Sequence, residues 1–273
     1  MVRSLWTAAN GMIAQQTNVD IIANNLANVN TTGFKAQTAQ FKSLLYQTLQ
    51  TKTTTANGDT KPNSAQVGLG VRTAAISTSF SNGSLQESSS DTAFALEGDG
   101  FFAVRGEDGN TYYTRSGDFT WAIGTNNTVQ LTTADGYVVL SSAGQPIQFS
   151  TATYAANKIT ITSDGTFCYP DANNNPQSLG VTFGVYQFSN PAGLTREGDN
   201  LYAQSAASGG PINEATNTAV TKTKVIQGYL EMSNVQVADE MVNLIVAQRA
   251  YEMNSKAITT TDEMMQQANE LKR

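Results

Sequence analysis

Histidine is absent from the 273 residues of the chain, and cysteine occurs once, at Cys168. A chain without histidine has no Ser-His-Asp or Cys-His nucleophile system, no histidine general base and no histidine metal ligand. One cysteine forms neither an internal disulfide nor a thiolate zinc site. We therefore expect no metal and no cofactor. We interpret Cys168 as an inert thiol on a strand, with a nucleophilic thiol as the weaker alternative.

Charged residues are scarce, since they make up 14% of the chain and leave a net charge of −6. Nucleic-acid-binding surfaces need clustered Lys and Arg, and the sequence has no basic run, so we expect no nucleic-acid partner. No stretch of about 18 apolar residues is present either, which argues against insertion in a membrane. The N-terminus lacks the apolar region and cleavage site of a secretory signal. The sequence thus predicts a cytosolic protein, or one exported without a cleaved signal peptide.

Apolar residues near the N-terminus follow a helical period. They recur every seven residues, as Leu5, Met12, Val19 and Leu26. This spacing predicts an amphipathic helix with a narrow apolar seam. We expect Ser4 to be its N-cap and Gly33 to take a positive φ just beyond its end.

A longer pattern with the same interval runs through residues 226–273. Its members are Leu230, Val237, Leu244, Tyr251, Ile258 and Met265, flanked by Met241 and Ile245. Heptads sustained over this length are typical of a coiled coil. Ser233 and Gln236 have capping-box spacing, so we expect the helix to begin near Asn234. The two ends carry net charges of opposite sign, which favours pairing between them, and two amphipathic helices packed on one globule are the alternative.

Between the ends the apolar period changes to two. Short segments rich in Val, Thr, Phe and Tyr, such as FFAVRG, TYYTR, TVQLTT and VTFGVYQF, alternate with turn sequences such as EDGN and SDGT. They predict β-strands. The expected fold class is α+β, with long N- and C-terminal helices pairing as a coiled-coil-like core and a central all-β domain. The expected domains are a helical segment at 1–45, an extended Thr/Asn-rich strip at 46–71, the β domain at 72–225 and a helical segment at 226–273.

Residues 50–66 of that strip have no apolar residue larger than alanine. Such a segment buries too little surface to fold alone. We interpret it as a flexible linker, or as a strip that orders only against neighbouring molecules.

Acidic residues beside glycine are the candidates for chemistry. They include Glu97, Asp99, Asp118, Glu197 and Asp199. A pair of them would suit a glycosidase, but acids in such positions more often form turns by bonding to their own backbone. The sequence has no D-x-[DN]-x-[DN]-G calcium loop, and Gly98 and Gly100 alone are a weak nucleotide signal. We therefore expect no catalytic site and no metal site.

The stretch NNLANVNTTGFK at 24–35 places four asparagines beside Leu26, Val29 and Phe34. Buried amides need hydrogen-bond partners, and a solvated helix would normally carry charges there. This stretch indicates contact with another protein surface.

Longer motifs carry a family resemblance. RSLWTAANGMIAQQTNVDIIANNLANVNTTGFKAQ, GDGFFAV, YYTRSGDF, EGDNLY and GYLEMSNVQVADEMVNLIVAQRAYEMNSKAI resemble the motifs of bacterial flagellar rod and hook subunits. Within this family, RSLW, LLYQTL and the short length are most similar to subunits of the distal rod. The resemblance covers both ends and several points of the middle.

The resemblance implies a structural subunit, not an enzyme, that polymerises helically into a rigid hollow drive shaft and carries motor torque to the hook. It implies proximal rod and hook subunits, flagellar ring (bushing) proteins and the type III export apparatus as partners, and a place in the basal-body rod that crosses the periplasm. A proximal rod or hook subunit is the near alternative, and a peptidoglycan-cleaving enzyme is the remote one.

The resemblance also implies which residues assemble. The N-terminal interface would contain Leu5, Met12, Val19, Asn24, Asn25, Leu26, Asn28 and Val29. The C-terminal interface would contain Val237, Met241, Leu244, Ile245, Tyr251, Ile258 and Met265. The chain would turn at Gly33 and Phe34 toward the β domain.

Overall fold

The computed structural model describes residues 2–50, 65–124, 128–151, 154–155, 158–171, 175–217 and 220–271. The chain forms two compact units, each made of separate parts of the sequence. Unit 1 consists of Met1–Ala27, Gln37–Thr78 and Gln236–Arg273, and unit 2 consists of Asn28–Ala36 and Ser79–Val235.

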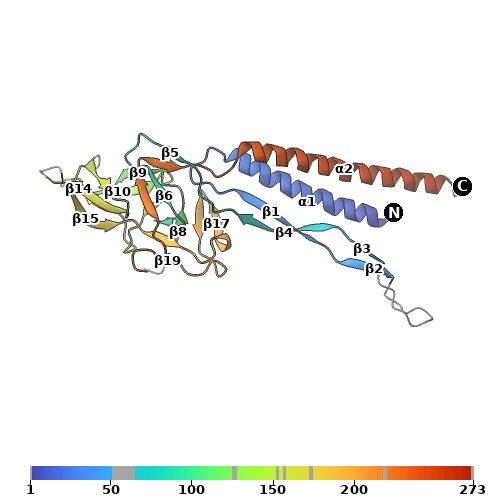
Figure 1. Ribbon diagram of the computed structural model, residues 1–273, viewed down its shortest axis with the longest axis horizontal. Helices are drawn as coiled ribbons and strands as arrows, with labels where there is room; N and C mark the ends of the chain where they lie inside the picture. The colour runs from blue at the N-terminus through green and yellow to red at the C-terminus, as the bar shows by residue number, and fades with distance from the viewer. Residues whose placement is uncertain are drawn as a thin grey trace. The chain divides into compact units, whose positions relative to one another are not determined.

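Unit 1 contains two helices and two antiparallel strand pairs. Helices α1 (Val2–Ala27) and α2 (Val237–Glu270) lie side by side (Figure 1). Strand β1 (Gln37–Ser43) pairs with β4 (Val71–Thr78), and β2 (Tyr46–Gln50) pairs with β3 (Ala65–Gly68). The ends of the predicted strip thus lie in a two-stranded ribbon, whereas its residues 51–64 lie outside the described part of the chain.

The predicted fold class with a coiled-coil-like core is wrong. The described residues form two α-helices and are otherwise mostly β, and the buried residues of α2 are Ala247 and Thr261. A coiled coil buries large apolar side chains at its repeating seam. Here small or polar side chains are buried, while Met241, Ile245 and Tyr251 are exposed. The seven-residue repeat therefore does not form a buried apolar seam, since Val237 and Tyr251 are exposed and Leu244, Ile258 and Met265 are half-buried.

Both predicted helix starts are also wrong. Helix α1 begins at Val2, so Ser4 lies inside its first turn. Helix α2 begins at Val237, and Gln236 is its N-cap without a side-chain bond to the helix. The Ser233 hydroxyl instead accepts a hydrogen bond from the Val235 N–H at 3.3 Å. The capping-box sequence therefore forms a local turn before the helix, as serine side chains often do.

Unit 2 is built from antiparallel strands. Ten of them are β7 (Phe101–Arg105), β8 (Thr111–Thr114), β9 (Phe119–Ile123), β10 (Thr128–Thr133), β11 (Val138–Val139), β12 (Gln148–Ser150), β16 (Val185–Gln187), β17 (Thr195–Gly198), β18 (Leu201–Ala203) and β19 (Ile212–Asn213). They form one sheet with the main order β12-β10-β11-β7-β8-β18-β17, in which β16 pairs with β7 and β19, and β9 pairs with β10.

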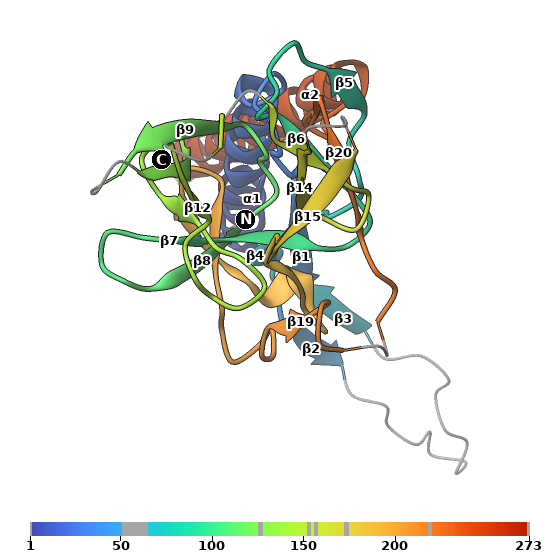
Figure 2. The same ribbon diagram turned by 90° about the vertical axis from the view of Figure 1, so that its left-hand side faces the viewer.

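The remaining strands of unit 2 form smaller sheets. Strands β13 (Thr160–Ile161), β14 (Thr166–Pro170) and β15 (Pro176–Thr182) make a three-stranded sheet, in which β14 and β15 lie side by side (Figure 2). Strand β5 (Leu85–Glu87) pairs with β21 (Tyr229–Glu231), and β6 (Phe94–Glu97) pairs with β20 (Lys224–Gln227). The last two strands of unit 2 are thus paired with its first two.

Aromatic rings fill the core of unit 2. The Phe102 ring centroid lies 5.2 Å from those of both Phe119 and Phe183, and the Phe94 centroid lies 5.1 Å from that of Phe183. The Phe102–Phe119 and Phe94–Phe183 pairs are edge-to-face, an arrangement that stabilises aromatic clusters beyond the burial of their area. Cys168 is buried on β14, so the prediction that it lies on a strand is confirmed.

Candidate assembly interface

Helix α2 leaves its larger apolar side chains exposed. Among the predicted interface residues, Val237, Met241, Ile245 and Tyr251 are exposed. Val242 and Val246 are 59% and 62% exposed, although they were not among the predicted interface residues. Fully burying an aliphatic side chain contributes about 1.5–3 kcal/mol. This row of side chains therefore favours contact with another protein surface.

The other predicted residues of α2 are partly covered. Leu244, Ile258 and Met265 are half-buried. Ile258 and Met265 share a helical face with Asn254, which packs so closely on Gly11 of α1 that a Cβ there would lie 2.9 Å from the Asn254 amide nitrogen. Gly11 thus permits the close approach of the two helices at this level.

Helix α1, like α2, has both half-buried and exposed apolar residues. The four predicted seam residues Leu5, Met12, Val19 and Leu26 are half-buried. Trp6 follows Leu5 in the sequence and Ile13 follows Met12, and these two side chains are 66% and 64% exposed. Two predicted interface residues from different helices, Val19 and Tyr251, line one groove of about 440 Å³ together with Gln16, Gln248 and Glu252.

The asparagines of the amide-rich stretch have different environments. Asn24 is exposed, whereas Asn28 and Val29 are half-buried. Asn25 is 0% exposed, and its Nδ2 donates to the Gln37 carbonyl at 2.8 Å and to Glu240 Oε1 at 3.0 Å. Asn25 therefore joins α1, β1 and α2 within the chain instead of facing a neighbouring molecule.

The chain turns sharply at Gly33. Its φ is +69°, which confirms the predicted positive value. A Cβ at this position would lie 2.5 Å from the backbone nitrogen of Ser116, so only glycine fits. The adjacent Phe34 is buried, and the Arg196 guanidinium lies over its ring at 5.6 Å from the centroid.

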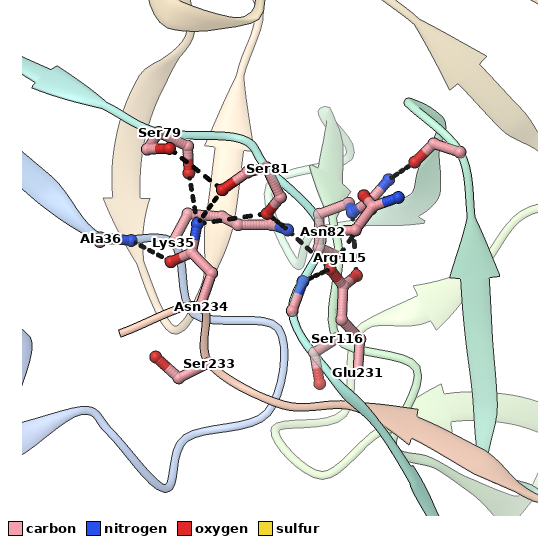
Figure 3. A network of polar contacts seen from close by, with 12 residues as sticks. Lys35, Ala36, Ser79, Ser81, Asn82, Arg115, Ser116, Glu231, Ser233 and Asn234 are labelled. Carbon is pink, nitrogen blue, oxygen red and sulfur yellow. Dashed lines mark hydrogen bonds and ion pairs between the residues drawn. The ribbon is translucent and has the colours of Figure 1, made fainter. Parts of the chain in front are cut away.

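A buried charge cluster joins three distant chain segments in unit 2 (Figure 3). Lys35 Nζ lies 2.6 Å from Glu231 Oε1, and Arg115 Nε lies 3.1 Å from Glu231 Oε2. All three side chains are at most 2% exposed. The Arg115 guanidinium also donates to the carbonyls of Gly98 and Gly100.

The Glu231 carboxylate is held by further contacts. Its Oε1 accepts a hydrogen bond from the Gly83 N–H at 2.9 Å, and Lys35 Nζ donates to the Ser81 carbonyl at 2.7 Å. Burial, with a further contribution from Arg115, lowers the pKa of Lys35, and the nearby Glu231 opposes this shift. This cluster was not predicted from the sequence, because its members are up to 196 residues apart.

Asn234 completes this junction (Figure 3). Its Oδ1 accepts from the Ala36 N–H at 2.7 Å, and its Nδ2 donates to the Ser79 carbonyl at 2.9 Å. An amide that both donates and accepts can replace a missing strand contact, so Asn234 fixes the two segments on either side of it.

Among the acidic residues considered for chemistry, Asp99 lies near the charge cluster, where its negative charge opposes the lowering of the pKa of Lys35. Glu97 forms an exposed ion pair with Lys224 at 3.6 Å. Asp118 lines a polar pocket of about 380 Å³ with Asp135 and Asp199, and Asp199 lies in a turn with φ +47°. Within the described residues there is no group of three or more His, Cys, Asp or Glu able to hold a metal ion. Neither described helix is long and apolar enough to span a membrane.

Three family models match the chain. "Flagella basal body rod protein" matches residues 5–35, "Flagellar hook protein FlgE/F/G D1 domain" matches 95–169, and "Flagellar basal body rod FlgEFG protein C-terminal" matches 226–271. The chain is 46% identical to the flagellar basal-body rod protein FlgG of Borreliella burgdorferi, over all of both chains. The chain belongs to the flagellar basal-body rod protein family.

Other members of the rod family are similar over nearly the same length. The flagellar basal-body rod protein FlgG of Agrobacterium fabrum is 42% identical over 96% of this chain and 97% of its own. That of Bacillus subtilis is 39% identical over all of both chains. The rod family is structural and not enzymatic, so this chain is a structural rod subunit and the remote peptidoglycan-cleaving alternative is set aside. Family membership implies a place in the flagellar basal body.

Proposed function

We propose that this chain is a subunit of the distal rod, which polymerises helically into a stiff, hollow drive shaft and carries motor torque to the hook. The proposal rests on one structural observation, the uncovered apolar side of α2, in a chain whose relatives over its full length are basal-body rod proteins. Monomeric proteins rarely expose large contiguous apolar patches, and such patches mark interaction sites.

Helical polymerisation needs two different faces on each subunit. An interface between unlike faces does not close on itself, so it propagates into a filament. The exposed residues of α2, such as Met241 and Ile245, supply one apolar face, and Trp6 and Ile13 of α1 supply another. Both helices have few charges among these residues, which avoids stranding unpaired charges on burial.

The predicted interface residues belong to this proposal. We assign Leu5, Met12, Val19, Asn24, Leu26, Asn28 and Val29 to the N-terminal contacts. We assign Val237, Met241, Leu244, Ile245, Tyr251, Ile258 and Met265 to the C-terminal contacts. Asn25 supports the N-terminal contacts from inside the chain, because its amide is already bonded there.

The proposed partners are other copies of this chain, proximal rod and hook subunits, flagellar ring proteins and the type III export apparatus. The proposed location is the part of the rod that crosses the periplasm, reached without cleavage of a signal peptide. The proposed domain division keeps segments 1–45 and 226–273 for assembly, 46–71 as the strip and 72–225 as the β domain.

A proximal rod or hook subunit is the second candidate, because one matching family model is described as a basal-body rod protein and another as a hook protein. The two candidates differ in the neighbours of the subunit and in whether its polymer is straight. Tomography of basal bodies with a small tag on this chain would locate it.

The test is assembly in cells that lack the native protein. Wild-type chain should restore rods visible by cryo-tomography, and Ile245→Asp should not, because it places a charge in the uncovered apolar face. Thr195→Asp is the matched control, since Thr195 is exposed on β17 and outside that face. Rods built at the wild-type level by Ile245→Asp would contradict the proposed face, and absence of this chain from rods would contradict the function.

A further inference from the structure

The last chain segment of unit 2 closes the unit. Strand β21 pairs with β5, and the Met232 N–H donates to the Ser84 carbonyl at 2.9 Å. The Gly33 N–H donates to the Glu231 carbonyl at 2.7 Å, and the Asn234 N–H donates to the Phe34 carbonyl. Residues 231–235 are therefore held between the first segment of the unit and its first strand.

The same segment brings in the negative charge of the buried cluster. Lys35 and Arg115 are both buried, and Glu231 is the carboxylate that forms ion pairs with each of them. With Glu231 in place the three side chains have a net charge of +1, and without it they would have +2. Removing one partner of a buried ion pair strongly destabilises a protein, because the remaining charge is left desolvated and uncompensated.

We propose that Lys35, Arg115 and Glu231 form a folding latch, in which the two cations hold unit 2 open until the Glu231 carboxylate is inserted between them. The closing residue lies 196 residues after Lys35 and 116 after Arg115. Contacts of such sequence separation are expensive in loop entropy and form slowly. Unit 2 thus becomes stable only when nearly the whole chain is available.

This order of events has a use that rests on the proposed function. A chain exported in an extended state must not fold early, and a unit whose closing charge comes near its C-terminal end stays open while the chain is incomplete. The electrostatic latch itself is independent of export and is measurable on the purified full-length protein.

The latch predicts that loss of one cation rescues loss of the carboxylate. Glu231→Gln keeps the shape and the acceptor for Gly83, but removes the carboxylate that forms ion pairs with both buried cations and leaves only the more distant charge of Asp99 near Lys35. Lys35→Met leaves the Arg115–Glu231 ion pair. The double variant, which combines Lys35→Met with Glu231→Gln, leaves one buried cation, Arg115, which still donates to the carbonyls of Gly98 and Gly100. Glu97→Gln is the matched control, since Glu97 lies in an exposed ion pair.

Amide hydrogen exchange in β7 and β8 of the full-length variants is the measurement. Glu231→Gln should increase exchange rates on the order of 100-fold or more, and Glu97→Gln should leave them within about 3-fold of wild type. The double variant should exchange at least about 10-fold more slowly than Glu231→Gln, because it removes one of the two opposing charges.

A purely packing role for Glu231 gives the opposite result, since each further substitution would then add damage. The latch is refuted if the double variant exchanges as fast as Glu231→Gln or faster, including the case in which both are unfolded. The latch is also refuted if the amide exchange rates of Glu231→Gln in β7 and β8 equal those of Glu97→Gln. If the rescue holds but the wild-type chain is absent from rods, the latch stands and the proposed function fails.

Discussion

Asn25 holds both backbone groups of Gln37 with one side-chain amide. Its Nδ2 donates to the Gln37 carbonyl at 2.8 Å, and its Oδ1 accepts from the Gln37 N–H at 2.9 Å. The amide thus reproduces the paired hydrogen bonds of an antiparallel strand neighbour at the start of β1. A second bond from Nδ2 to Glu240 Oε1 extends this contact to α2.

Asn25→Asp should destabilise unit 1 severely. The new carboxylate has no N–H to offer Gln37 and faces the carboxylate of Glu240, so we expect a loss of about 3 kcal/mol or more in the free energy of unfolding. Urea unfolding and amide exchange of β1 measure the effect. Asn24→Asp is the control, because Asn24 is exposed on the same helix, and equal stability of the two variants would contradict the assigned role of Asn25.

The sequence marked this stretch as unusual but did not show which amide is buried. Every asparagine between 24 and 30 has the same chemistry, and burial depends on where β1 and α2 pass. The structure places Asn25 beside both, whereas Asn24 is exposed. Tertiary contacts therefore decide the role, and a one-dimensional pattern contains no information about them.

Gly33→Ala should cost more than an ordinary glycine substitution. A left-handed conformation costs a non-glycine residue roughly 1–2 kcal/mol, and the added Cβ would also meet Ser116 and Arg115 backbone atoms within 3 Å. Gly144→Ala isolates the first contribution, because Gly144 has φ +73° with nothing near its Cβ position. We expect urea unfolding to show Gly33→Ala as the less stable variant by at least about 1 kcal/mol. Equal losses would mean that the close approach at Gly33 relaxes without cost.

Tyr113 should make the protein sensitive to alkali. Burial, with a smaller contribution from Tyr186, raises the pKa of Tyr113 to about 12 from its ordinary 10.0. A raised pKa of an acid means that folding favours the neutral phenol. The resulting stability is fully present below pH 10.0 and is lost as the pH rises through the folded pKa of about 12.

Tyr113→Phe removes this titration and keeps the ring. The free energy of unfolding, measured with urea at several pH values, should therefore fall less steeply for Tyr113→Phe than for wild type between pH 10.0 and about 12. Burial lowers the pKa of Lys35, but this residue is present in both proteins and its contribution cancels in the comparison. Tyr229→Phe, at a more exposed tyrosine, serves as the control, and identical slopes for all three proteins would contradict the prediction.

Strands were easier to predict than helix contacts. The segments FFAVRG and TVQLTT lie on β7 and β10, since alternation of side chains and turn residues are local properties. The repeat from Val237 to Met265 did predict a helix, but not its packing, because the same spacing suits a seam against α1 and a face toward another molecule. Only the position of α1 in the structure separates the two.

The charge cluster lay beyond sequence reasoning for a different reason. Lys35, Arg115 and Glu231 are isolated charges in weakly charged segments, and nothing local pairs them. Their one signal was scarcity: charges in apolar surroundings need partners, and here the partners come from distant segments.

Leu244 and Ile245 provide a final, direct separation of folding from assembly. They are neighbours on α2, but Leu244 is half-buried and Ile245 is 55% exposed. Leu244→Asp should lower the stability of unit 1 in the purified monomer by about 2–4 kcal/mol, because it removes apolar contacts and places a charge in a partly buried position. Ile245→Asp should change the stability of the monomer by less than about 0.5 kcal/mol, as exposed substitutions do, yet both variants should abolish rod assembly in cells.

Thermal unfolding of the monomers measures the stability, and tomography of the cells measures rod assembly. Assembly by Ile245→Asp would show that the exposed side of α2 is not a subunit contact, and a stable Leu244→Asp monomer would show that this position contributes to assembly alone.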